Sequence, residues 1–325
     1  IIGTHNFHKL PELLNNIENK NERIYEVWDE EQGLIPDIPS RRENDYKAWV
    51  SIIRGCNNFC SYCIVPYVRG RERSRTPENI MKEIKSLVEE GIKEITLLGQ
   101  NVNSYGKDLE SKIDFASLLK RLDKIKNLKR IRYMTSHPRD FNQKLIDTIK
   151  ESKKVCEHFH LPVQSGSTRI LQKMNRGYTR KEYINLVESI RQALPDASIT
   201  TDIIVGFPGE TEEDFQNTLD LVEKLRFDMA FTFSYSPRSG TPAAKMENTV
   251  SEEIKDKRLQ QLMKIQNKIS LENNKKLKGK ILEVLIEGES KNNPETYSGR
   301  SRTNKLVIIP KKEQLKGEII KVKIN

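Results

Sequence analysis

The decisive stretch of this sequence reads Arg54-Gly55-Cys56-Asn57-Asn58-Phe59-Cys60-Ser61-Tyr62-Cys63. It directly follows the first predicted strand, so its cysteines lie in a loop at a strand end. Three thiolates in the spacing C-x3-C-x2-C can bind three irons of a cubane cluster, whereas four would saturate it. The remaining iron keeps an open coordination position for catalysis. We therefore predict an iron–sulfur site whose ligands are Cys56, Cys60 and Cys63.

Three other interpretations of these cysteines remain open. A structural zinc site would require a fourth ligand and usually has two paired motifs. A disulfide is unusual in a reducing compartment, and the chain shows neither a secretion signal nor a window of roughly 20 apolar residues. Unliganded core cysteines are rare at this density. We expect a cytoplasmic protein that makes no membrane contact.

Outward from this stretch, strands and helices alternate from residue 48 to about residue 238. The predicted strands are Trp49–Ile53, Ile95–Leu98, Ile131–Met134, Phe159–Val163, Ile199–Val205 and Ala230–Tyr235. Helix-capping signals at Thr76, Thr179 and Thr211 lie between them. Such units favour a parallel sheet with outer helices, and six are too few for a closed eight-fold barrel. We predict the α/β class and a partial six-stranded parallel (β/α) barrel, with the chemistry at the C-terminal strand ends.

The segments around this barrel divide the chain further. Residues 1–20 are predicted to end a truncated N-terminal domain, because the chain opens on Ile1-Ile2-Gly3 without a Met and we expect it to continue upstream. Residues 21–47 are a predicted linker, residues 48–250 the barrel and residues 251–277 a bridging helix. Residues 278–325 form a predicted small β-domain. Its expected strands are Ile281–Ile286, Leu306–Ile309 and Ile319–Ile324.

Positive charge is concentrated at the C-terminal end. The formal net charge is +10, and from Lys275 onward 13 Lys and Arg stand against six Asp and Glu. Such asymmetry favours a polyanionic partner, although a solvated surface is the alternative. Two groups of side chains are candidates for phosphate contacts. They are Arg69, Arg71, Arg73 and Arg75 after the cysteines, and Arg300, Arg302 and Lys305 in the β-domain.

The three-cysteine loop resembles the radical S-adenosylmethionine (SAM) superfamily, and the surrounding motifs resemble its methylthiotransferases, most closely the MiaB group. These motifs are Val65–Arg75, Leu97–Gly106, Leu161–Ser167 and Asp202–Thr211. The C-terminal segment is similar to a TRAM domain, a small RNA-binding β-barrel. The resemblance implies methylthiolation at C2 of isopentenyladenosine next to the anticodon of tRNA, with SAM bound at the open iron. It also implies a second cluster on three N-terminal cysteines that this sequence lacks, so we expect one 4Fe–4S cluster here and an incomplete reaction.

Strand-end residues are the further cofactor-binding candidates that the resemblance suggests. They are Tyr62, Gly99, Gln100, Gln164, Ser165 and Gly206. Ordinary loop packing is the alternative for Tyr62, and a turn leading to the Thr211 cap is the alternative for the stretch from Gly206 to Glu210. His158 and His160 share one strand face and are either functional or satisfied core histidines. The expected partners are tRNA and a reductant protein such as flavodoxin or ferredoxin, and we expect a monomer.

Other functions were weighed against this one. Within the family, the substrate could be threonylcarbamoyladenosine in tRNA or a ribosomal-protein aspartate. The motif Gln100-Asn101-Val102-Asn103 resembles the tRNA branch and disfavours the aspartate. In a different class, the chain could be a non-catalytic RNA-binding protein with a structural metal. Cleavage of SAM after anaerobic cluster reconstitution distinguishes these classes.

Overall fold

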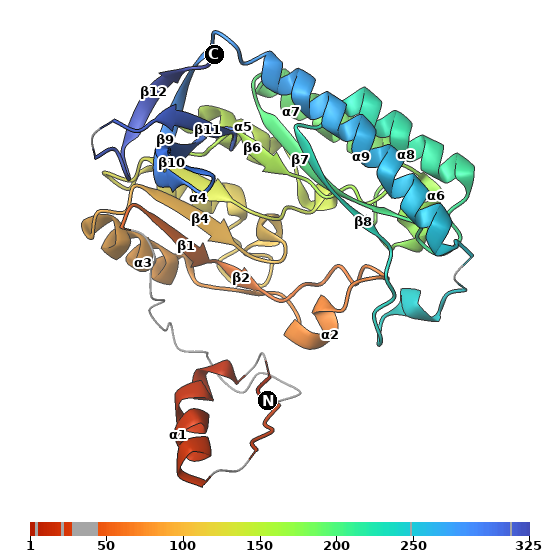
Figure 1. Cartoon of the computed structure of the whole chain (residues 1–325). Coiled ribbons are helices and arrows are strands. Elements are labelled where there is room, and N and C mark those ends of the chain that lie inside the picture. The colour runs from red at the N-terminus through yellow and green to blue at the C-terminus, as the bar shows by residue number, and fades with distance from the viewer. Residues whose placement is uncertain (4–5, 21–22, 28–44, 248, 313) are drawn as a thin grey trace.

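The computed structural model describes residues 1–3, 6–20, 23–27, 45–247, 249–312 and 314–325. Six parallel strands form its central wall (Figure 1). They are β1 (Lys47–Ser51), β4 (Glu94–Leu98), β5 (Arg130–Tyr133), β6 (His158–His160), β7 (Ser198–Val205) and β8 (Met229–Ser234). All six predicted strands are confirmed. Their hydrogen-bonded order is β1-β4-β5 and β6-β7-β8, and a single parallel bridge from Ile131 to Val155 leads toward β6.

Helices cover the outer face of this wall. They are α3 (Pro77–Glu89), α4 (Phe115–Asp123), α5 (Gln143–Glu151), α6 (Thr168–Lys173), α7 (Arg180–Ala193) and α8 (Glu212–Leu225). Thr76 caps α3, while Thr179 and Thr211 each form a capping box at the start of α7 and α8. The large core unites the apolar faces of these helices with strand residues such as Val50 and Phe159. The predicted partial (β/α) barrel is therefore confirmed.

Short elements surround the ends of the strands. They are β2 (Ile53–Arg54), α2 (Val65–Arg69), β3 (Arg73–Ser74) and the 3-10 helices η2 (Val102–Ser104), η3 (Pro138–Asp140) and η4 (Pro242–Lys245), whereas the 3-10 helix η1 (Phe7–Lys9) lies in the N-terminal segment. β2 and β3 pair antiparallel and enclose the cysteine loop and α2. This hairpin fixes both ends of the predicted metal-binding segment.

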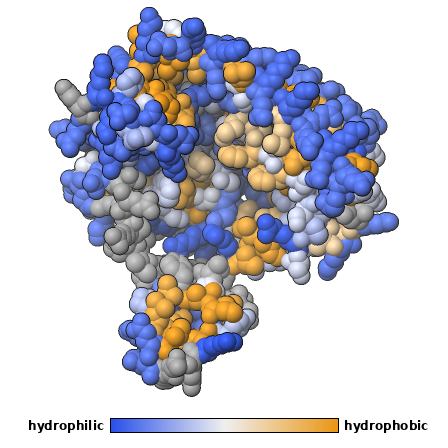
Figure 2. Space-filling view, in the orientation of Figure 1, coloured by the Kyte–Doolittle hydropathy of each residue, from blue (hydrophilic) through white to orange (hydrophobic). Residues whose placement is uncertain are grey.

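The N-terminal segment contains α1 (Leu10–Lys20). Of its four apolar positions at helical spacing, Leu13 is buried, while Leu10, Leu14 and Ile17 are exposed. Ile2 forms a parallel bridge with Glu26. Figure 2 shows the apolar surface of this segment. Most of the predicted linker 21–47 lies outside the described residues.

The helix predicted as a bridge, α9 (Glu252–Lys275), lies along the barrel wall against β8 and α8. Leu262 and Ile269 face the core, whereas Met263 is exposed. Polar side chains occupy the rest of the buried face: Lys255, Arg258 and Gln266. Because their atoms bond to strand-end loops, α9 is part of the barrel wall as well as a connection.

The C-terminal domain is an antiparallel sheet in the order β11-β10-β9-β12. The strands are β9 (Ile281–Ser290), β10 (Asn293–Ser301), β11 (Leu306–Pro310) and β12 (Ile319–Lys323). Three of them were predicted, whereas β10 was not. Its inward positions are Tyr297, Gly299 and Ser301, so only one of them carries a large apolar side chain.

This domain packs against the N-terminal ends of the barrel strands. Arg130, the first residue of β5, is fully buried and donates to Glu283 at 2.9 Å and to the Arg300 carbonyl at 2.9 Å. At the start of β1, Tyr46 donates to the carbonyl of Glu287 at 2.5 Å. The cysteine loop follows the C-terminal end of β1, so the two features lie at opposite ends of the barrel (Figure 1).

Among the described residues, we find no helix with both the length and the apolar character needed to cross a lipid bilayer.

Candidate metal and cofactor site

The cysteine loop is compact and largely buried. Cys56 and Cys60 are buried, Cys63 is half-buried, and none of the three forms a disulfide. Burial raises the pKa of the Cys56 thiol to about 11, with Glu72 adding to the effect, and burial also raises the pKa of Cys63. A metal must therefore displace protons from these sulfurs. Within the described residues, no three acidic, His or Cys side chains already stand together as a metal site.

Backbone geometry at Gly55 holds the start of this loop. Gly55 has φ +69°, and a Cβ there would lie 2.0 Å from the carbonyl oxygen of Arg71. The Cys56 amide donates to the Gly70 carbonyl at 3.2 Å, and the Glu72 amide donates to the side-chain oxygen of Asn57 at 3.2 Å. Only glycine fits this left-handed position beside the returning chain. The first cysteine is thereby anchored to the segment that leads into β3.

A buried arginine that the sequence analysis missed lies against the cysteines. Arg176 is 4% exposed, and its Nη1 lies 3.2 Å from Cys60 Sγ and 3.4 Å from the Tyr62 hydroxyl. Its Nη2 donates to the Pro162 carbonyl at 2.7 Å, and its Nε lies 3.0 Å from the Tyr178 hydroxyl. A guanidinium here offsets the negative charge of thiolates. No sequence pattern joins it to residues 116 positions away.

The three thiols and this cation fit an iron–sulfur cluster. The three cysteines come from one loop, form no disulfide and have a buried positive group beside them. Tyr62 also lies near these cysteines. Its partly buried side chain packs against the apolar side chains of Ile170, Met174 and Phe207. Burial raises the pKa of Tyr62 well above its usual value, so its hydroxyl stays protonated and can donate.

The predicted glycine and glutamine after β4 occupy different environments. A Cβ on Gly99 would lie 2.4 Å from Cγ2 of Ile53, so packing against β2 explains the glycine. The Gln100 side chain has a buried Oε1 atom without a hydrogen-bond partner among the described groups. An unsatisfied buried acceptor is unusual and can receive a donor from a ligand.

The candidates after β6 are tightly held. Gln164 is buried and adopts φ +73°, a left-handed conformation that non-glycine residues rarely take. Ser165 is completely buried, and its hydroxyl accepts from the Ser167 amide at 3.2 Å. Ser165 therefore shapes the backbone of this loop, while strain at Gln164 is of the kind found at binding sites.

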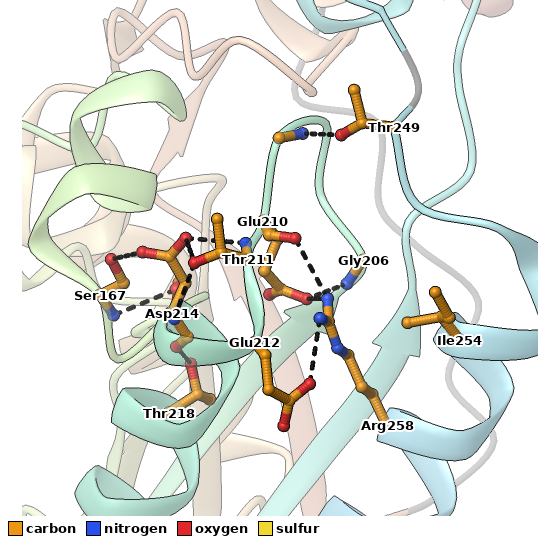
Figure 3. Close-up of polar contacts among 12 residues, drawn as sticks. Ser167, Gly206, Glu210, Thr211, Glu212, Asp214, Thr218, Thr249, Ile254 and Arg258 are labelled. Atoms are coloured by element: carbon orange, nitrogen blue, oxygen red, sulfur yellow. Dashed lines mark hydrogen bonds and ion pairs between the residues drawn. The ribbon is translucent and has the colours of Figure 1, made fainter.

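The loop after β7 is attached to α9, as Figure 3 shows. The carboxylate of Glu210 accepts from the Gly206 amide at 2.7 Å and from Arg258 Nη1 at 2.8 Å. Both side chains of this ion pair are less than 10% exposed. Burial raises the pKa of Glu210 despite the neighbouring Arg258. Gly206 itself has φ +72°, and a Cβ there would lie 2.3 Å from Cγ of Lys255, so close packing explains this glycine.

The predicted phosphate-binding side chains differ between the two groups. Arg69 is exposed, and the exposed Arg71 lies over the Phe59 ring at 4.5 Å. Arg73 is also exposed, whereas Arg75 is half-buried and pairs with Glu83 at 2.6 Å.

In the C-terminal group, Arg302 pairs with Glu157 at 2.6 Å and Lys305 with Asp228 at 2.6 Å. Arg300 lies 3.9 Å from Glu287. Both Glu157 and Asp228 belong to the barrel. Arg302 and Lys305 therefore join the two domains, and phosphate binding by them stays a prediction that requires these pairs to open.

The two strand histidines share one hydroxyl. His160 Nδ1 lies 3.0 Å and His158 Nε2 lies 3.2 Å from Thr200 Oγ1. Burial lowers the pKa of His158 to about 3, with the Arg132 charge adding to the effect. His158 is therefore neutral at physiological pH, as expected for a satisfied core histidine.

Comparison with known proteins gives consistent matches. A model of the radical SAM superfamily matches residues 50–222, and a model of the TRAM domain matches residues 275–325. The tRNA-2-methylthio-N(6)-dimethylallyladenosine synthase of Desulforamulus reducens is 58% identical over all 325 residues, which span 71% of that protein. The enzyme of the same name from Carboxydothermus hydrogenoformans is 57% identical, with 74% of its length covered.

A solved structure resembles the fold. Coproporphyrinogen III oxidase from Escherichia coli, a radical SAM enzyme, matches with a TM-score of 0.53 and 13% identity. The match covers 81% of this chain and 68% of that chain. At this identity the likeness concerns the fold alone.

Proposed function

This chain belongs to the tRNA-2-methylthio-N(6)-dimethylallyladenosine synthases within the radical SAM superfamily, and we propose that it methylthiolates C2 of isopentenyladenosine next to the tRNA anticodon. The observation that carries this function is the similarity to such synthases at 58% identity along the whole chain. The chain is thus a transferase of sulfur-containing groups. Membership of the superfamily implies a 4Fe–4S cluster and SAM.

Cys56, Cys60 and Cys63 are the proposed cluster ligands. When bound, the cluster and SAM supply a reductively generated radical that activates the adenine carbon for sulfur insertion. The protein's part is to hold these groups and exclude water. Arg176 donates to Cys60 Sγ and keeps this thiolate oriented, because its other nitrogens are bound to fixed groups of the barrel.

The strand-end loops are proposed to hold SAM. Gln164 and Gln100 lie in the loops that follow β6 and β4. Arg176 Nη1 contacts both the Tyr62 hydroxyl and Cys60 Sγ. Ser165 and Gly99 shape the backbone around them. The loop that begins at Gly206 contributes through its main chain, which the Glu210–Arg258 pair immobilises.

The remaining assignments complete this proposal. Beyond the loop the sequence has one further cysteine, Cys156, which is buried, so we infer one cluster within these 325 residues. A second cluster would need cysteines from a preceding segment. We also propose a monomer that acts on tRNA in the cytoplasm and receives electrons from a small reductant protein such as flavodoxin or ferredoxin.

Anaerobic reconstitution with iron and sulfide tests the proposal. The chain should bind roughly four irons and, with a strong reductant, cleave SAM to 5′-deoxyadenosine, measured by chromatography. The affinities for anticodon stem-loops that carry isopentenyladenosine or threonylcarbamoyladenosine distinguish the two tRNA substrates. The proposal expects tighter binding of the first. Retention of stoichiometric zinc without iron uptake would contradict the assignment. Multiple-turnover methylthiolation by these 325 residues alone would contradict the inference of a single cluster.

A further inference from the structure

One face of β8 presents apolar side chains to solvent. Met229, Phe231 and Phe233 alternate along the strand and are 42%, 46% and 52% exposed. The residues between them are less exposed, on the side that packs against α9. Since alternate side chains of a strand point to opposite faces, all three lie on the inner face of the barrel. Apolar groups that repeat along one inner face mark a binding surface more strongly than scattered ones do.

The strand at the other end of the wall carries a matching group. β1 and β8 are the outer strands of the order, and no described ladder joins them, so the barrel is open between them. Trp49 on β1 is 67% exposed, while its neighbours Ala48 and Val50 are buried. Trp49 pairs in register with Thr96, so its side chain shares the inner face of β4. Aromatic groups therefore stand on both sides of the opening, and Figure 2 shows apolar residues between the charged flanks.

Phe231 is held in place although it is exposed. Its ring meets the His160 ring edge-on at 6.0 Å between centroids. His160 in turn contacts Thr200 at 3.0 Å and Asp202 at 3.4 Å. Asp202 is also the register partner of Phe231 on β7. Because these contacts fix the ring before any ligand arrives, binding to its open side loses little conformational freedom.

We propose that the inner face of β8, centred on Phe231, binds the N6-dimethylallyl chain of the target adenosine and selects isopentenylated tRNA. This inference rests on the proposed function and adds a specificity determinant to it. A branched hydrocarbon chain complements exposed Phe and Met side chains through burial of apolar area. A base that leaves the RNA stack also gains from an aromatic face such as that of Trp49.

The chemistry of the base limits its direction along the strand. C2 and C6 flank N1 and their outward bonds diverge, so C2 can face the cysteine loop while the N6 chain extends away from it along the barrel. Phe233 lies closer to the C-terminal strand ends, and Phe231 and Met229 follow at steps of about 6.6 Å. Phe233 therefore flanks the base, while Phe231 and Met229 meet the chain.

Binding of two RNA probes tests this surface without requiring activity. The probes are one anticodon stem-loop with N6-dimethylallyladenosine and the same oligonucleotide with plain adenosine. The wild-type chain should bind the modified probe at least about tenfold more tightly, the ratio expected when about two of the chain's five carbons are fully buried. Phe231→Ala should reduce this preference to about twofold and leave the plain probe unaffected, while Phe231→Leu should keep most of it. Met263→Ala, an exposed methionine on α9, is the matched control and should change neither affinity.

The outcomes separate the two levels of the proposal. If wild-type protein shows the preference and Phe231→Ala shows it equally, the β8 surface is overturned while the substrate assignment stands. Equal losses for both probes also overturn it, because selectivity is then unchanged. A wild-type chain that binds both probes alike removes the substrate assignment and the inference together.

Discussion

A buried arginine lies at each end of the barrel, but the two are balanced differently. At the cysteine end, Arg176 lies against the Cys60 thiol and donates to the Pro162 carbonyl, so its charge is balanced only in part by protein groups. At the opposite end, Arg130 meets Glu283 and Glu94 and two carbonyl oxygens, which satisfy it within the protein. A cation without a carboxylate partner marks the end where a negatively charged ligand binds, while a fully paired one marks a structural junction.

The largest expected effect is at the cysteine end. Cys60→Ala should abolish cluster binding after anaerobic reconstitution, because two thiolates cannot hold the cubane. Cys156→Ala is the matched control, since this cysteine is buried in the protein interior away from the loop. Iron analysis and the visible absorption of the cluster measure both variants. Full iron loading of Cys60→Ala, or its loss in Cys156→Ala, would contradict the ligand assignment.

Substitutions at the opposite end of the barrel should lower the free energy of unfolding. Arg130→Ala removes one partner of a buried ion pair and should lower the free energy of unfolding by about 3–5 kcal/mol. Arg121→Ala breaks an exposed pair with Glu78 and should cost less than about 1 kcal/mol. Urea unfolding of the apo chain measures both. If the two variants are equally stable, the junction is not held by buried charge.

Substitution of Arg176 should affect the rate of SAM cleavage and the reduction potential of the cluster. Arg176→Gln should slow SAM cleavage by about 10–100-fold, since a charged hydrogen bond is worth about 1.5–3 kcal/mol. The reduction potential of the cluster should fall, because a positive group is lost beside a cysteine sulfur. Arg176→Lys keeps the charge without the forked geometry and should be intermediate. Redox titration followed by electron paramagnetic resonance gives the potential, and an unchanged value would make the residue purely structural.

The smallest effect concerns RNA binding. Arg69→Ala, at an exposed position near the cysteines, should reduce the slope of log affinity against log salt by about 0.7–0.9. Arg302→Ala should leave this slope unchanged and lower stability instead, because Arg302 pairs with Glu157 across the junction. Filter binding across a salt series separates the two. A reduced slope for Arg302→Ala would return this arginine to the phosphate-binding group.

Sequence patterns predicted the parts of the fold that depend on local order. The six barrel strands contain short apolar runs or alternating apolar residues, and the helix caps at Thr179 and Thr211 use short-range hydrogen bonds. β10 was missed because Gly299 and Ser301 fill inward positions that only the packed sheet reveals. The cysteine loop was recognisable from spacing alone.

Contacts between distant segments were not predictable from one sequence. Arg176 lies 116 residues from Cys60, and Arg258 lies 48 residues from Glu210. Arg302 was assigned to phosphate because a basic residue in a β-domain carries no sign of its partner. Its pairing with Glu157 spans 145 residues. In each case charge was visible in the sequence, whereas the group that balances it was not.

The placement of the β-domain also sets an order of events during synthesis. Arg130 and Glu94 are buried at the N-terminal end of the barrel, which is its floor. Glu283 and the carbonyl of Arg300 cover this floor. Both are synthesised more than 150 residues after Arg130. A ribosome therefore releases the cysteine loop and all six barrel strands before the groups that close the opposite end exist. Until the last strands emerge, the floor of the nascent barrel is an open polar surface. Closure of this floor waits on synthesis of the strands between residues 281 and 323, at roughly 5–20 residues per second.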